Sequence, residues 1–283
     1  MPLWGFLFGQ HLSDGILDYN MAEYIKKYNP NRSAEWNYGG AKWRLSRSKI
    51  DFFFECPRCF YLDNKLGTKR PSFPSFNLNI AVDELFKKEF DTYRKAKTPH
   101  PIMTKYNVAA VPFAHKSMNE WRDPFVGIEY TEPETGLTVS GGVDDIWVTK
   151  DKELIIVDYK STSKDGTITE LSDSPWDLQY TRQLGVYRWL LEKNGFSVLP
   201  IGYLVYANAS KDLPTFDDKL IFETTLVSVE TDIEWIIPTL RSIKTCLDSN
   251  QIPAIGDRCE FCPYRESCGK KLQAIHYANK KSS

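Results

Sequence analysis

The 283-residue sequence predicts an α/β protein in which helices flank a mixed central sheet. Two observations predict this class. Segments rich in β-branched and aromatic residues alternate with segments whose apolar residues recur at helical spacing. The composition, 42% hydrophobic and 26% charged, is ordinary for a globular chain. The length therefore allows one large domain with a small, cysteine-rich appendage at its C-terminal end.

Four helices are expected from their caps and their spacing. Ser46 or Ser48 can cap a helix near residue 46, because a serine hydroxyl accepts hydrogen bonds from the free amides of a first turn. Further helices are expected over residues 78–95, 176–193 and 231–247. The apolar stripe of the 78–95 helix consists of Ile80, Val82, Leu85, Phe86 and Phe90.

The strands are expected between these helices. Residues 137–148 and 153–159 are β-rich and are separated by a short polar turn, so they are expected to form a hairpin. Residues 202–206 and 220–229 are two further strands. From residue 251 onward the chain is expected to be a loop that bears cysteines.

These elements suggest three parts of the chain. Residues 1–44 form a loosely ordered arm, residues 45–250 form the main domain, and residues 251–283 close onto residues 56–59. Residues 1–20 match no downstream pattern, and Met21 is an alternative start.

Charge is distributed unevenly along the chain. The net charge is -1, but residues 41–105 hold 14 Lys and Arg against 7 Asp and Glu, which leaves 22 basic and 30 acidic residues elsewhere. A basic segment suits contact with phosphates, although an unevenly charged solvated surface explains it equally well. The aromatic share of 14% is compatible with stacking on unpaired bases.

The sequence has no stretch long enough to span a membrane and no features of a secretion signal. A cytoplasmic location is therefore expected, without a membrane partner. In that reducing compartment, clustered thiols are more often metal ligands than disulfides.

A group of carboxylates and one lysine indicates a catalytic site. Asp158 and Lys160 are two residues apart on a strand, so they project to the same face, and the hairpin can bring Asp144 beside them. Close carboxylates repel unless a cation lies between them, and oxygen ligands favour Mg²⁺ or Mn²⁺. Lys160 could stabilise charge on a phosphate or help to deprotonate an attacking water. Asp145 should face the opposite side. The alternative is a surface hairpin with ordinary ion pairs, because Asp-x-Lys alone is a weak motif.

Polar residues also recur at four-residue steps on the 176–193 helix. Gln179, Gln183 and Tyr187 would share one face, where they could contact a nucleic-acid backbone or hold Lys160 in place. The alternative is an exposed polar face with no further role.

The motifs Gly-x-Val-Asp ending at Asp144, Val-Asp-Tyr-Lys-Ser-Thr over 157–162 and Gln-x-x-x-Tyr over 183–187 resemble the RecB-like branch of the PD-(D/E)XK nucleases. The resemblance implies a restriction-endonuclease-like core that cleaves DNA, as an exonuclease on single strands or ends. A helicase or a CRISPR-adaptation protein is an implied partner. An inactive DNA-binding module and an RNA-directed nuclease remain alternatives.

The resemblance also implies the roles of single residues. Lys160 would be catalytic, and Gln183 and Tyr187 would support DNA contact. Asp144, Asp158 and the carbonyl of Tyr159 would bind Mg²⁺ or Mn²⁺. The family often has a histidine ligand on an upstream helix, and Asp83 stands in that place, where it would be a further ligand of Mg²⁺ or Mn²⁺. The replacement of histidine by Asp83 is also the main support for the inactive module.

The cysteines predict a second metal centre. Cys259-x₂-Cys262-x₅-Cys268 is compact, and the segment Cys56-Pro-Arg-Cys59 can complete it. In one scheme Cys56 joins the late trio around a [4Fe-4S] cluster. In the other, the pairs 56/59 and 259/262 form a Cys₄ zinc site, which the spacing slightly favours. Cys246 is expected in the core.

The segment from Ser46-Arg-Ser-Lys-Ile to Cys56, with the late cysteines, resembles the iron–sulfur nucleases of the AddB and CRISPR-associated RecB-like groups. This resemblance implies a [4Fe-4S] cluster held by Cys56, Cys259, Cys262 and Cys268. Cys59 departs from that pattern, so zinc remains the alternative.

Overall fold

The computed structural model describes residues 29–71 and 75–281. Most of the expected arm, including Met21, lies outside these ranges. Residues 29–44 are described and contain the 3₁₀ helix η1 (Ala34–Trp36). They are held against the folded body, since the Tyr38 hydroxyl donates to Asp248 at 2.7 Å and Trp43 Nε1 donates to Asn64 at 3.1 Å.

The main sheet has five strands in the order β2–β5–β6–β7–β8. Their bounds are β2 (Ala110–Pro112), β5 (Asp145–Thr149), β6 (Leu154–Thr162), β7 (Ile201–Ala209) and β8 (Phe222–Glu230). The β6–β7 pair is parallel and the other neighbours are antiparallel, so the expected mixed sheet is confirmed. A parallel pair requires a crossover connection, and helix α7 (Pro175–Lys193) provides it.

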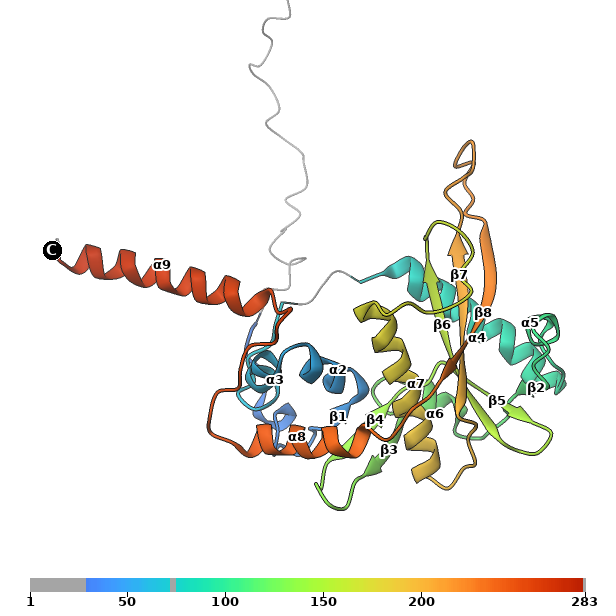
Figure 1. Cartoon of the computed structure of the whole chain (residues 1–283), viewed down its shortest axis with the longest axis horizontal. Coiled ribbons are helices and arrows are strands. Elements are labelled where there is room, and N and C mark those ends of the chain that lie inside the picture. The colour runs from blue at the N-terminus through green and yellow to red at the C-terminus, as the bar shows by residue number, and fades with distance from the viewer. Residues whose placement is uncertain (1–28, 72–74, 282–283) are drawn as a thin grey trace, which may run out of the picture.

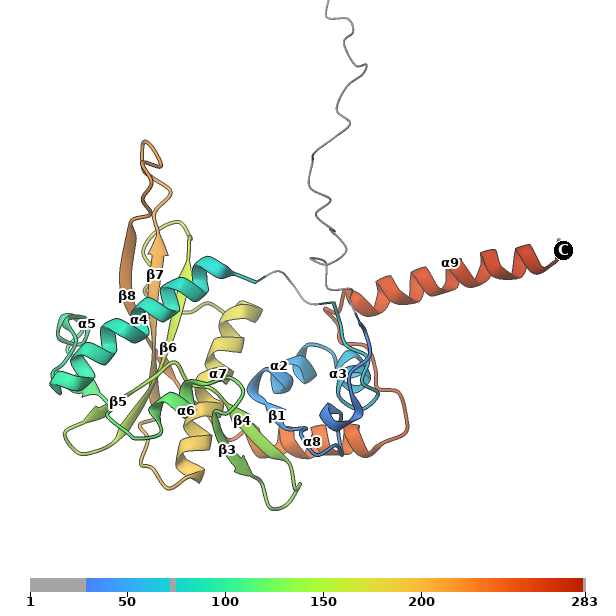
Figure 2. The ribbon, with the colours of Figure 1, turned by 180° about the vertical axis from the view of Figure 1, so that it is seen from behind.

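One long helix covers each face of this sheet (Figures 1 and 2). Helix α4 (Asn77–Ala96) packs Phe86 and Phe90 against the odd-numbered residues of β6, while α7 packs Leu184 against the even-numbered ones. Because successive side chains of a strand point to opposite faces, the odd-numbered residues of β6 belong to one hydrophobic core and the even-numbered residues to the other. Ile80 and Leu85, which were expected in the apolar stripe of α4, are exposed instead.

The segment expected as a single strand over 137–148 is divided between two sheets. Strand β4 (Thr138–Gly141) pairs with β1 (Leu45–Ser46) and β3 (Ile128–Thr131), and the chain crosses to β5 only at Asp145. A Cβ atom on Gly141 would lie 2.6 Å from the Tyr187 ring, so only glycine allows β4 to pass α7 this closely. The expectation that Asp144 lies on a strand was therefore wrong, because Asp144 lies in the junction between the sheets.

The remaining helices lie around this core. Helix α2 (Arg47–Glu55) is capped by Ser46 as expected, since the Ser46 hydroxyl accepts from Lys49 N–H. It packs with α3 (Pro57–Asn64), which in turn packs with α8 (Ile236–Asp248). Helices α5 (Pro101–Lys105) and α6 (Met118–Arg122) are short. Within the described ranges, no helix combines the length and the apolar character needed to cross a membrane.

The C-terminal segment is not the loop expected from residue 251. It becomes helix α9 (Phe261–Lys281), which extends away from the body (Figure 1). Residues 269–281 are rich in Lys, Ala, Leu and Gln, which have high helix propensity. Pro263 and Gly269 have low helix propensity, and for this reason a loop was expected here from the sequence.

Candidate active site and metal centre

Asp158 and Lys160 lie on the α7 face of strand β6, as the alternation along a strand predicts. The Lys160 ammonium donates to Asp158 Oδ2. Gln183 on α7 contacts both side chains: its Nε2 donates to Asp158 Oδ1 at 2.7 Å, and its Oε1 accepts from Lys160 Nζ at 3.2 Å. An amide can make both contacts because it has a donor and an acceptor, so Gln183 fixes the two charged groups relative to each other.

The polar residues Gln183 and Tyr187 of α7 do not form an exposed face. Gln183 and Tyr187 are buried, and the Tyr187 hydroxyl lies 3.1 Å from Gln183 Nε2. Gln179 lies one turn closer to the N-terminus, is half-buried, and makes no side-chain hydrogen bond to any residue within 29–71 or 75–281. Gln183 therefore holds Asp158 and Lys160 in place, and Tyr187 lies against Gln183. Gln179 makes no such contact.

Asp144 reaches this group from the junction between β4 and β5. Its Oδ2 accepts from the Tyr159 backbone N–H at 3.0 Å, and its carboxyl contacts that of Asp158. Burial and the Asp144 carboxylate together raise the pKa of Asp158 to about 7, against the opposing effect of Lys160. Two acids this close are therefore under electrostatic strain without a cation.

Asp83 approaches the same place from helix α4. Its Oδ2 accepts from Lys87 Nζ at 2.6 Å, and its Oδ1 is buried without a hydrogen-bond partner among the described residues. Burial, followed by the charge of Asp144, raises the pKa of Asp83. Lys87 Nζ also lies 3.6 Å from Asp144 Oδ1. Lys87 was not among the residues predicted for the site, although its position four residues after Asp83 was a usable signal.

These carboxylates have the properties of a site for a hard divalent cation. Asp144 contacts Asp158 and lies close enough to raise the pKa of Asp83, so acidic side chains from three elements approach one another, although within the described residues their oxygens do not all lie within 4.8 Å of one another. Asp83 and Asp158 have raised pKa values, and one buried oxygen of Asp83 has no partner in the described part of the chain. Carboxylate oxygens are ligands that Mg²⁺ and Mn²⁺ accept. The residues therefore fit the metal that the sequence predicts.

Asp145 faces the other side of the sheet, as expected. Its buried carboxylate accepts from Arg94 Nη2 at 2.5 Å and from the Tyr159 hydroxyl at 2.6 Å, and Arg122 lies 3.3 Å away. Asp145 is thus neutralised inside the protein. The Tyr159 side chain also points away from the site, and ligation by the Tyr159 carbonyl remains a prediction.

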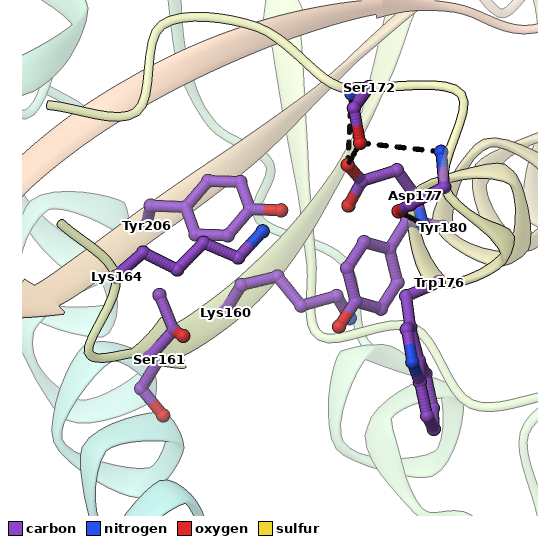
Figure 3. Close-up of a pocket in the computed structure, with 10 residues that line it drawn as sticks. Lys160, Ser161, Lys164, Ser172, Trp176, Asp177, Tyr180 and Tyr206 are labelled. Carbon is purple, nitrogen blue, oxygen red and sulfur yellow. Dashed lines mark hydrogen bonds between the residues drawn. The ribbon is translucent and has the colours of Figure 1, made fainter. Parts of the chain in front are cut away.

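Two hollows flank the carboxylate group. One is lined by Ser46, Arg47 and Ser48 together with Asp144 and Gln183. The other lies on the far side of Lys160, between the end of β6 and the first turns of α7 (Figure 3). The site is therefore open on both sides, as a chain-like substrate would require.

Four cysteines form a second, buried cluster. The Sγ atoms of Cys56, Cys59, Cys259 and Cys262 all lie within 4.8 Å of one another. Burial raises the pKa of Cys56, but hydrogen bonds from the backbone N–H groups of Gly256 and Cys59 outweigh it and lower this pKa to about 7. A thiolate among buried thiols is the form that binds metal. This cluster joins the N-terminal segment to the C-terminal segment, as expected.

Two arginines contact the cluster and favour the thiolate form, whereas burial raises the pKa values of Cys59 and Cys262. Arg70 Nη2 lies 3.3 Å from Cys259 Sγ, and Arg265 Nη2 lies 3.6 Å from Cys262 Sγ. A Cβ atom on Gly256 would lie 2.1 Å from the Glu55 carbonyl oxygen, so glycine is needed where the C-terminal segment passes Cys56.

The membership of the cluster differs from the iron–sulfur scheme. Cys59 belongs to it, whereas Cys268, which was expected as a ligand, lies outside it on α9. Cys268 follows Cys262 by six positions in the helix, which places it about 9 Å further along the axis and about 120° around it. Its thiol forms a hydrogen bond with Tyr264 instead. Cys246 packs against the main core from a half-buried position.

Comparison with known proteins shows the family of the chain. A model of the PD-(D/E)XK nuclease superfamily matches residues 77–269, which include Asp83, Asp144, Asp158 and Lys160. No curated protein matches the chain. The crystal structure of SSO0001 matches with a TM-score of 0.33 and 11% identity, over 82% of this chain and 84% of that chain. Because the family match spans more than half of its length, the chain belongs to the PD-(D/E)XK nuclease superfamily.

Proposed function

We propose that the protein is a metal-dependent nuclease that hydrolyses phosphodiester bonds in DNA, on single strands or at ends. The observation that carries this proposal is the convergence of Asp83, Asp144 and Asp158 with Lys160. The motifs around Asp144, Asp158 and Gln183 support a place in the RecB-like branch.

The chemistry divides between the carboxylates and Lys160. A divalent cation held by Asp83, Asp144 and Asp158 would supply charge neutralisation at the phosphate and a more acidic water. The ammonium of Lys160 lies beside Asp158, where it stabilises the charge that develops on the phosphate oxygens. Gln183 fixes the positions of Lys160 and Asp158 relative to each other through two hydrogen bonds.

The basic side chains on both rims support a nucleic-acid substrate. Arg47 lines the hollow beside Asp144, and Lys164 lines the one beyond Lys160. Positive groups on both sides of a cleavage site can neutralise the phosphates that precede and follow the scissile bond. DNA is the substrate that the resemblance implies, and RNA is the alternative.

Lys87 favours one competing function, a DNA-binding module without catalysis. Its ammonium lies between Asp83 and Asp144 and already neutralises part of their charge. If no metal displaced Lys87, the fold would bind DNA without cleaving it.

A cleavage assay separates these functions. End-labelled single-stranded and duplex DNA are incubated with the protein in Mg²⁺ or Mn²⁺. Lys160→Ala is compared with Lys150→Ala, which removes an exposed lysine of the β5–β6 turn. We expect Lys160→Ala to lose cleavage and Lys150→Ala to keep it. Equal cleavage by Lys160→Ala and the unchanged protein would indicate a contaminant and favour the inactive module.

The cysteine cluster has a structural role in this proposal. It ties Cys56 and Cys59 to Cys259 and Cys262 across the chain, so a bound metal acts as a clasp. Three of the Sγ–Sγ distances, 3.3, 3.6 and 3.9 Å, suit one tetrahedral ion, in which sulfurs about 2.3 Å from zinc lie close together. An iron–sulfur cluster, with several irons between its cysteines, remains the alternative.

A further inference from the structure

The hollow beyond Lys160 has the size of a small-ligand site, and most of its lining residues have no role in the chemistry derived above. Its volume is about 360 Å³, within the range of roughly 300–1,000 Å³ typical of such sites. Its walls are the end of β6, the loop after it, the first turns of α7, and Tyr206 from β7 (Figure 3). Because Lys160 is shared, any ligand here lies next to the scissile phosphate.

One wall is aromatic. Trp176 is the second residue of α7 and is 68% exposed, although tryptophan is normally well covered. Tyr180 follows one helical turn later on the same face, with its ring centroid 4.5 Å from Lys160 Nζ. Figure 3 shows the indole at the edge of the hollow and the phenol ring in front of Lys160. Exposed aromatic rings beside a basic group are what unpaired bases stack upon.

The interior holds an unsatisfied polar group. Tyr206 is only 2% exposed, and its buried hydroxyl has no hydrogen-bond partner among the described residues. Figure 3 shows this hydroxyl and the Lys164 ammonium both pointing into the hollow. Burial raises the pKa of Tyr206, which keeps the hydroxyl protonated as a donor. An unpaired buried donor costs stability, so a ligand that supplies an acceptor would be favoured.

We propose that this hollow binds one nucleotide of an unpaired strand beside the scissile phosphate. The base stacks on Trp176 and Tyr180, a phosphate lies toward Lys164, and the Tyr206 hydroxyl donates to an oxygen of the base or backbone. This assignment rests on the proposed nuclease function and narrows its substrate. A paired base already stacks on both sides within a duplex, so the hollow selects single-stranded over double-stranded DNA.

The test measures binding without cleavage. Fluorescein-labelled oligo-dT and a matched duplex are titrated with the protein in buffer without added Mg²⁺ or Mn²⁺, and anisotropy gives both Kd values. Trp176→Ala should weaken oligo-dT binding about ten-fold or more while changing duplex binding little. Trp176→Phe should recover most of the affinity. The matched control is Trp36→Ala, which removes a partly exposed tryptophan of η1 that lines neither hollow.

Tyr206→Phe provides the second measurement. It removes only the unpaired hydroxyl, so the melting temperature should stay equal or rise while oligo-dT binding weakens. Two results would overturn the proposal: normal oligo-dT binding by both variants, or equal weakening of single-stranded and duplex binding. Failure of the nuclease proposal looks different, because an inactive binding module would not cleave DNA yet would keep the Trp176 effect.

Discussion

The ammonium of Lys87 lies 2.6 Å from the carboxylate of Asp83, one turn away on the same helix, and 3.6 Å from that of Asp144. This lysine therefore occupies part of the space in which a divalent cation would have to bind. Competition between Lys87 and metal follows directly from this arrangement.

Replacing Lys87 by Met should strengthen Mn²⁺ binding about ten-fold, which corresponds to roughly 1.4 kcal/mol. The reason is that Asp83 and Asp144 lose their resident cation. The metal-free protein should melt at a lower temperature, because the acids then repel each other unopposed. Titration followed by Mn²⁺ paramagnetic resonance gives the affinity, and Lys88→Met, an exposed neighbour, is the control. Weaker Mn²⁺ binding in Lys87→Met would contradict the competition.

Gln183→Ala should lower kcat by about 10- to 100-fold and change KM little. The variant frees Asp158 and Lys160 from the amide that fixes them, without removing either group. Gln179→Ala is the matched control on the same helix face, and any effect there should be on KM. Single-turnover cleavage under saturating DNA distinguishes the two. Equal effects of both variants would show that the hydrogen bonds to Gln183 do not matter.

Asp144→Asn and Asp145→Asn should have opposite effects although the residues are adjacent. Asp144→Asn removes a carboxylate from a repelling group, so activity should be lost while stability is kept or increased. Asp145→Asn removes the buried anion of Arg94 and Arg122 and leaves them only the part-exposed Asp91, which should cost about 3 kcal/mol of unfolding free energy. Urea unfolding and cleavage assays on the same samples measure both effects. Loss of stability in Asp144→Asn with none in Asp145→Asn would reverse the assignment.

The cysteine cluster predicts which thiols hold metal. Cys59→Ser and Cys262→Ser should lose bound metal and melt at a lower temperature, whereas Cys268→Ser should resemble the unchanged protein. Metal content, absorbance near about 400 nm and thermal unfolding are measured together, since that absorbance identifies an iron–sulfur cluster. Metal loss in Cys268→Ser but not in Cys59→Ser would mean that α9 rearranges around an iron–sulfur cluster.

Lys49 should make stability depend on pH in the alkaline range. Burial lowers its pKa to about 8, and the charges of Arg32 and Arg44 add to this effect. Because the charged form is disfavoured only in the folded protein, the penalty is complete below about pH 8 and disappears by about pH 10.5. Stability should therefore rise with pH across this window.

Comparison with Lys49→Met isolates this effect from other titrating groups. Between about pH 7 and about pH 10, the unchanged protein should gain up to roughly 3 kcal/mol relative to the variant. Guanidinium unfolding at both pH values measures the difference. The same pH dependence in both proteins would exclude Lys49 as its source.

The amino-acid sequence alone determined the local part of this protein. The helix caps, the β5–β6 hairpin and the common face of Asp158 and Lys160 follow from interactions within a few residues and from the period of a strand. The orientation of Asp145 toward the opposite face followed from the same period. These features need no knowledge of distant contacts.

Only the tertiary structure decided which distant groups meet. The division of residues 137–148 between two sheets depends on the close approach of Gly141 to Tyr187, and the position of Lys87 against Asp144 depends on how α4 packs. The choice of Cys59 over Cys268 depends on whether α9 begins before or after the last cysteine. Contacts between distant residues are fixed by packing of whole elements, which spacing along the chain does not encode.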